Sequence, residues 1–125
     1  MELSDEEFEK MIAEAMNELP SEYMQNMDNV AIVFADDPTP EQLQKQGVRS
    51  GELLLGLYEG IPLTRRYSSS YSGVLPDKIT LFKHPILQVC YDEASLHEQI
   101  KRTLWHEIAH HFGLDHRDID QRQRK

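Results

Sequence analysis

Two histidines four residues apart, followed by a glycine and a further histidine, stand in the segment HEIAHHFGLDH at residues 106–116. Residues four apart in an α-helix differ by about 40° around its axis and by about 6 Å along it, so His106 and His110 would present their imidazoles to one point. Imidazole nitrogens bind zinc at about 2.0–2.1 Å. The spacing therefore predicts a helix here that supplies two nitrogen ligands to one zinc ion.

The next histidine lies too far along the chain to share that helix with the first two. Residue 116 would stand about 15 Å beyond His106 along a straight helix axis. Gly113 comes before it, and glycine takes positive φ at a helix C-terminus without steric cost, so the chain can fold back beneath the site. We therefore predict His116 as the third ligand, with the fourth position open for water as in catalytic zinc sites.

Glu107 follows the first histidine of this segment. It is displaced by about 100° around the helix from His106, near enough for its side chain to reach a metal-bound water without ligating the metal. We therefore predict Glu107 as a general base. The pattern His-Glu-x-x-His arises by chance in roughly 3% of chains of this composition, but Gly113 and His116 lower that chance to about one in ten thousand.

Other polar side chains are candidates for supporting roles. His111 points about 100° away from His110, so we expect it to pack or to support a ligand, not to bind the metal. Acidic residues near the third ligand can accept a hydrogen bond from a ligand imidazole; here they are Asp115, Asp118 and Asp120. Tyrosines and arginines of a nearby strand and loop can stabilise an oxyanion; the candidates, among which the sequence does not choose, are Tyr58, Arg65, Arg66, Tyr67 and Tyr71.

Helical signals mark both ends of the chain. A capping box at Ser4, with a glutamate three residues later, predicts a helix over about residues 4–18. Ser95 offers a similar cap and predicts a helix over about residues 94–112, in which Trp105 packs into the core. One stripe of that second helix is apolar at first and polar at its end. Its members are Leu96, Ile100, Leu104, Glu107 and His111.

Short apolar runs between these helices predict β-strands. The runs are 30–34, expected to be buried, 53–58, a candidate sheet edge, and 79–83. Gly56 lies within the second run, where a glycine indicates a bulge or the close approach of another backbone. Residues 39–46 predict a brief helical turn, 64–77 a surface loop and 117–125 a frayed tail. The order of elements predicts one α+β domain over residues 1–125.

The length and net charge of the chain limit the number of domains and the classes of binding partner. The 125 residues fit one domain with a single core. With 13 Lys and Arg against 22 Asp and Glu, the net charge of −9 opposes nucleic-acid binding, which depends on clustered Lys and Arg.

The N-terminus, MELSDEEFEK, is unlike an export signal, and no stretch approaches the roughly 18 apolar residues of a membrane span. Because Cys90 is the single cysteine, no intramolecular disulfide forms. We therefore expect a cytoplasmic protein without a membrane or nucleic-acid partner.

The pattern HExxHxxGxxH resembles the zinc-binding motif of the zincin metallopeptidases, in the form used by their metzincin branch. Metzincins place a methionine-containing turn after the third ligand, whereas the last methionine here is Met27, so the chain is not an ordinary metzincin. It is more similar to the bacterial mini-zincin family of small single-domain proteins. The similar segments cover most of the chain: MNELP (16–20), DNVA (28–31), GLYEGIPLT (56–64), PDKITLF (76–82) and EQIKRTLWHEIAHHFG (98–113).

The mini-zincin resemblance implies a compact fold in which a small mixed β-sheet packs against the N-terminal helix and the C-terminal metal helix. It also implies Zn²⁺ as the cofactor and peptidase-like chemistry on a peptide or small protein. In that family the third-ligand place is often Asp, whereas this chain has His116 preceded by Asp115. His116 remains the predicted ligand, and Asp115 is the alternative.

Two other functions stay open beside a zinc peptidase. The spacing HxxxHxxGxDH also resembles the bacterial three-histidine endoribonucleases that mature ribosomal RNA, although that family has Gly where this chain has Glu107, and the net charge of −9 disfavours RNA. The other alternative is a non-catalytic, metal-stabilised binding domain, against which the intact Glu107 counts. For a peptidase without a visible pro-segment, we expect little activity on folded proteins, and either small substrates, a narrow cleft or a regulatory partner.

Overall fold

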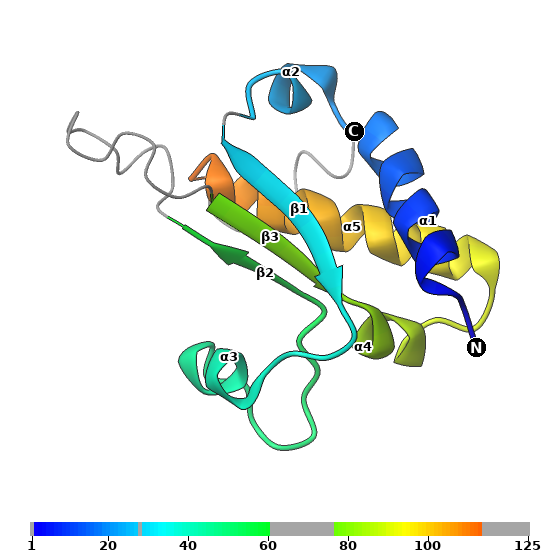
Figure 1. Ribbon diagram of the computed structural model, residues 1–125, viewed down its shortest axis with the longest axis vertical. Helices are drawn as coiled ribbons and strands as arrows, with labels where there is room; N and C mark the ends of the chain where they lie inside the picture. The colour runs from blue at the N-terminus through cyan, green and yellow to red at the C-terminus, as the bar shows by residue number, and fades with distance from the viewer. Residues whose placement is uncertain (1, 28, 61–76, 114–125) are drawn as a thin grey trace.

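The computed structural model of the protein describes residues 2–27, 29–60 and 77–113 (Figure 1). Helices and strands alternate irregularly along the chain, which confirms the predicted α+β class. In order, the elements are α1 (Asp5–Asn17), α2 (Ser21–Met24), β1 (Val30–Ala35), α3 (Pro40–Lys45), β2 (Gly56–Glu59), β3 (Asp77–Phe82), α4 (Lys83–Gln88) and α5 (Glu93–His111). None of the helices in the described residues is long and apolar enough to cross a membrane.

The three strands form one mixed sheet in the order β1-β3-β2. Strand β1 runs parallel to β3, with Val30 opposite Asp77, and β2 runs antiparallel to β3, with Tyr58 opposite Ile79. The predicted small mixed sheet is therefore confirmed. The prediction that residues 30–34 form a buried strand was wrong, because within the described residues β1 pairs with β3 alone and Val33 is 40% exposed.

Side-chain caps explain where the longer helices begin. Ser4 and Glu7 form the predicted capping box of α1. The cap of α5 was placed three residues too late, since Asp92, not Ser95, is the N-cap and accepts a hydrogen bond from the Ser95 backbone N–H at 2.8 Å. An N-cap residue has extended backbone, as Asp92 does. Helix α3 lies within the brief helical turn predicted over residues 39–46, whereas α2 and α4 were not predicted as helices.

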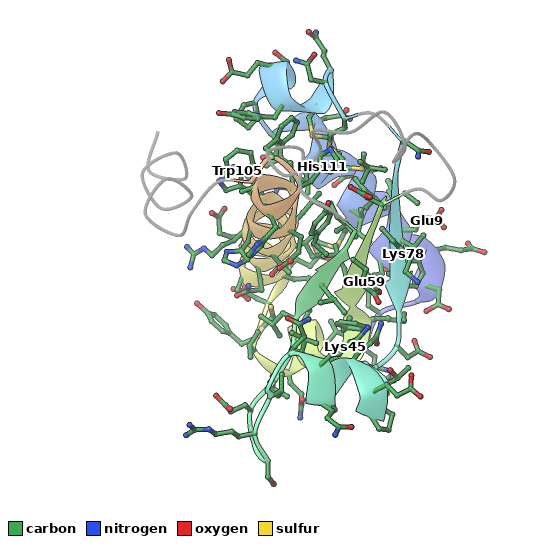
Figure 2. The ribbon with its side chains drawn as sticks, turned by 90° about the vertical axis from the view of Figure 1, so that its left-hand side faces the viewer. Glu9, Lys45, Glu59, Lys78, Trp105 and His111 are labelled. Atoms are coloured by element: carbon green, nitrogen blue, oxygen red, sulfur yellow. The ribbon has the colours of Figure 1, made fainter. Side chains whose placement is uncertain are left out.

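Helices α1 and α5 cover one face of the sheet with a continuous core (Figure 1). Figure 2 shows His111 and Lys78 on opposite sides of the sheet, with His111 on the side of α5. Each fully buried Leu, Ile or Phe side chain contributes about 1.5–3 kcal/mol to folding. The fully buried residues include Phe8 of α1, Ile79 and Leu81 of β3, and Leu96, Ile100, Leu104 and Ile108 of α5. Trp105 is 3% exposed and packs edge-to-face on Tyr23, so its predicted place in the core is confirmed.

Gly56 lies where β2 crosses closely over α5. A Cβ atom at this position would stand 2.7 Å from Cγ2 of Thr103 and 3.3 Å from Cγ of Glu107. The glycine indicated a bulge or the close approach of another backbone, whereas the atoms nearest to it belong to side chains of α5 and β3. Because a Cβ atom does not fit there without displacing its neighbours, residue 56 sets how near β2 lies to the helix that carries Glu107.

Substitution Gly56→Ala is expected to lower the free energy of unfolding by about 1–3 kcal/mol through overpacking. Thr103→Ser removes the Cγ2 atom nearest to the added methyl group and keeps the hydroxyl that accepts a hydrogen bond from Gln99 Nε2 at 2.9 Å. Urea unfolding of both single variants and of the double variant measures the coupling. We expect Thr103→Ser to recover much of the loss in the double variant, and strictly additive effects would contradict this explanation.

Candidate metal centre

The imidazole rings of His106 and His110, both in the last two turns of α5, lie side by side. Their Nε2 atoms are 3.1 Å apart, and their rings meet at an angle of 67°. Two nitrogens at this separation can both lie 2.0–2.1 Å from one zinc ion with an angle at the metal of about 100°, close to the tetrahedral value. Both His106 and His110 are partly exposed to solvent. The residues present therefore fit one half of a zinc site.

The helix ends immediately after these histidines through the predicted glycine turn. Phe112 is the C-cap of α5, and Gly113 follows with φ of 74°, a conformation that favours glycine. The Gly113 backbone N–H donates to the His110 carbonyl oxygen at 3.0 Å. The described part of the chain thus turns away from the helix axis where a third ligand from the following segment requires it.

The predicted third ligand lies outside the described residues, as does its alternative Asp115. Within the ranges 2–27, 29–60 and 77–113, no group of three or more His, Cys, Asp or Glu side chains is arranged to hold a metal. His116 therefore stays a prediction. The further candidates Asp118, Asp120, Arg65, Arg66, Tyr67 and Tyr71, with most of the predicted loop 64–77 and the tail 117–125, also lie outside the described residues.

Glu107 lies on the face of α5 that packs against the sheet and is 8% exposed. Burial disfavours its charged form and raises the pKa of its carboxyl group to about 7, while a hydrogen bond from the Tyr58 backbone N–H acts in the opposite direction. A general base works best when its pKa lies near the operating pH. The environment of Glu107 therefore suits a group that accepts and returns a proton near neutral pH.

A buried hydrogen-bonded network lies one helical turn beyond Glu107. His111 is fully buried, and its Nδ1 atom lies 3.0 Å from Oδ2 of Asp77, which is 2% exposed. The Tyr58 hydroxyl donates to the same oxygen at 2.6 Å. His111 thus packs inward, which is one of the two roles expected for it. The hydroxyl of Tyr58, a candidate oxyanion donor, is engaged with Asp77.

Asp77 is the residue of this network that the sequence analysis missed, since we assigned it to the end of a surface loop. Strand β3 begins at Asp77 itself. Side chains two apart in a strand share a face, so Asp77, Ile79 and Leu81 all point toward α5. The alternation of Asp77 with Ile79 and Leu81 could have shown that Asp77 faces the core, but it does not identify His111 as its partner.

The two remaining histidines of the described residues lie away from these groups. His84 is exposed, and its Nδ1 lies 2.8 Å from Oδ2 of Asp37. His97 is partly exposed and pairs with Glu18. Neither residue joins the centre at the end of α5.

Comparison with known proteins agrees with this arrangement. A model of the family described as zincin-like metallopeptidase matches residues 27–125. A solved structure of a conserved hypothetical protein from Thermus thermophilus superimposes with a TM-score of 0.58 at 22% sequence identity, covering 88% of this chain and 94% of that one. That likeness shows a shared fold. No protein of curated function matches the chain.

Proposed function

Because the chain belongs to the zincin-like metallopeptidase family, we propose that it is a zinc-dependent peptidase in which His106, His110 and His116 hold the metal and Glu107 is the general base. The observation that carries this proposal is the pair of Nε2 atoms 3.1 Å apart on α5, next in sequence to a buried carboxyl group whose pKa is raised to about 7. A structural zinc site requires no such carboxyl group beside it.

Zinc, Glu107 and the backbone of Tyr58 have separate roles in the proposed amide hydrolysis. Bound zinc supplies a Lewis acid that polarises the scissile carbonyl and makes water more acidic. Glu107 takes a proton from the attacking water and passes it to the leaving amine nitrogen, which a carboxyl group titrating near pH 7 does in both directions. The Tyr58 backbone N–H holds the Glu107 carboxyl against β2 between these two steps.

Short or unfolded peptides are the proposed substrates. The net charge of −9 makes polyanions such as RNA unfavourable ligands. The partly exposed histidines stand at the end of α5, whereas Glu107 is buried against the sheet, so a substrate has to bring its peptide bond into close contact with α5.

Elemental analysis combined with a quenched-fluorescence peptide library tests this function. We expect about one zinc ion per chain and cleavage of some short peptides that a chelator stops and added zinc restores. Native globular proteins serve as the comparison substrates, and they should remain intact. A protein that binds no zinc even after reconstitution would contradict the proposal.

A further inference from the structure

The predicted ligand His110 occupies a weak part of α5. It lies in the last turn of the helix, one residue before the end of the element. The last four carbonyl groups of an α-helix lack intrahelical partners, and helix ends fray. A metal ligand at this place needs support from outside the helix if its imidazole is to keep one direction.

The neighbouring residue provides a connection to the sheet. His111 Nδ1 lies 3.0 Å from Asp77 Oδ2, at the first residue of the central strand β3. Because a carboxylate oxygen accepts hydrogen bonds, this contact places the proton on Nδ1. The contact joins residues 34 positions apart and ties the last turn of α5 to the most enclosed strand of the sheet.

The carboxylate is itself held from two other sides. The Tyr58 hydroxyl donates to Oδ2 at 2.6 Å from strand β2, and the Tyr58 ring packs edge-to-face on the His111 ring with centroids 5.8 Å apart. On another side, Gly60 lies so near that a Cβ atom there would overlap the Asp77 carboxyl group. The acceptor that receives His111 is therefore held by β2 and by the glycine that follows this strand.

We propose that Tyr58, Asp77 and His111 form a positioning network that fastens the last turn of α5 to the sheet and so directs His110 toward the metal. Tyr58 contacts both acidic side chains, since its hydroxyl donates to Asp77 and its backbone N–H donates to the Glu107 carboxyl group. The network thus holds the last turn of α5, which carries His110, and the general base Glu107 in fixed positions relative to β2. The metal-binding part of this inference rests on the proposed function.

Two substitutions of His111 separate its hydrogen bond from its packing. His111→Phe keeps an aromatic ring beside Tyr58 and loses the Nδ1 donor, whereas His111→Asn loses the ring and keeps an N–H donor at the place of Nδ1. We expect His111→Phe to weaken zinc affinity by about 10–100-fold, as is typical for lost hydrogen bonds behind a metal ligand, and His111→Asn to recover most of that affinity. Competition with a chromophoric chelator measures both.

Amide hydrogen exchange of the metal-free protein supplies a readout that is independent of zinc. In the wild type, the N–H groups of Phe112 and Gly113 donate to the carbonyl oxygens of Ile108 and His110 at 3.2 and 3.0 Å. His111→Phe should speed exchange of these two amides by about tenfold, the effect of one lost hydrogen bond, and leave the middle of α5 unchanged. Tyr58→Phe, which removes only a hydroxyl, repeats the test if His111→Phe does not fold.

A core variant on another helix controls for general loss of stability. Ile12→Ala lowers stability from within α1 and should leave zinc affinity and the exchange of the last turn of α5 unchanged. Equal loss of affinity in His111→Phe and His111→Asn, or no effect of either, would overturn the positioning network. If the wild type binds no zinc, the proposed function fails, while unchanged exchange in His111→Phe overturns the network on its own.

Discussion

Glu107→Gln is expected to retain zinc and to lower kcat for peptide cleavage by about 10²–10⁴-fold, because the amide that replaces the carboxylate cannot accept the proton of the attacking water. Gln has nearly the same size, and the predicted ligands are unchanged. Burial raises the pKa of Glu107 to about 7, so its charged form is disfavoured in the fold, and a neutral amide should not destabilise the metal-free protein. Steady-state kinetics and elemental analysis of the same preparation measure both quantities.

Glu98→Gln is the matched control for this experiment. It makes the same chemical change at an exposed position of the same helix, and it should leave both kcat and zinc content as in the wild type. Full activity in Glu107→Gln would rule out Glu107 as the general base. Zinc binding without any peptide cleavage in the wild type, Glu107→Gln and Glu98→Gln alike would favour the alternative of a non-catalytic binding domain.

His110→Ala is expected to abolish stable zinc binding, since it removes one of two imidazole nitrogens that lie 3.1 Å apart. Zinc that binds the folded chain stabilises it by about 4 kcal/mol when its concentration is 1,000 times the dissociation constant. The variant should lose that stabilisation, so that added zinc no longer raises its melting temperature. Thermal unfolding with and without zinc, together with metal content, checks the result.

His97→Ala serves as the control for His110→Ala, because His97 lies on the same helix but pairs with Glu18 far from the centre. It should bind zinc as the wild type does. The same assay decides the third ligand: loss of zinc in His116→Ala with retention in Asp115→Ala would establish three histidines, and the reverse pattern would assign Asp115. Zinc binding that survives His110→Ala would refute the site itself.

Local features of the chain were predicted well where neighbours in sequence determine them. The capping box at Ser4 and the glycine turn at Gly113 depend on side chains a few residues apart, and both are present. The stripe from Leu96 to His111 is buried throughout because helical periodicity alone defines it. The prediction of His106 and His110 as paired side chains follows from the same periodicity.

Features that depend on distant contacts were missed. The exposure of β1 follows from strand order, which places it at an edge of the sheet in the part of the chain that the structure describes. The composition of Val30–Ala35 does not reveal that order. The role of Asp77 depends on His111, 34 residues away, and on Tyr58, 19 residues away. Neither pairing leaves a periodic signal, so both become visible only when the sheet and α5 are placed together.

One face of α5 carries both the apolar core residues and, further along, Glu107 and His111. Under the proposed function, the packed interior and the general base therefore share a single surface of this small protein. Leu104 and Ile108 are both fully buried on this face, so substitutions there change the packing around the Glu107 carboxyl group. Under the proposed function, a change in this part of the core therefore alters the catalytic site as well as the stability of the domain, whereas segments outside this shared face can change without either effect.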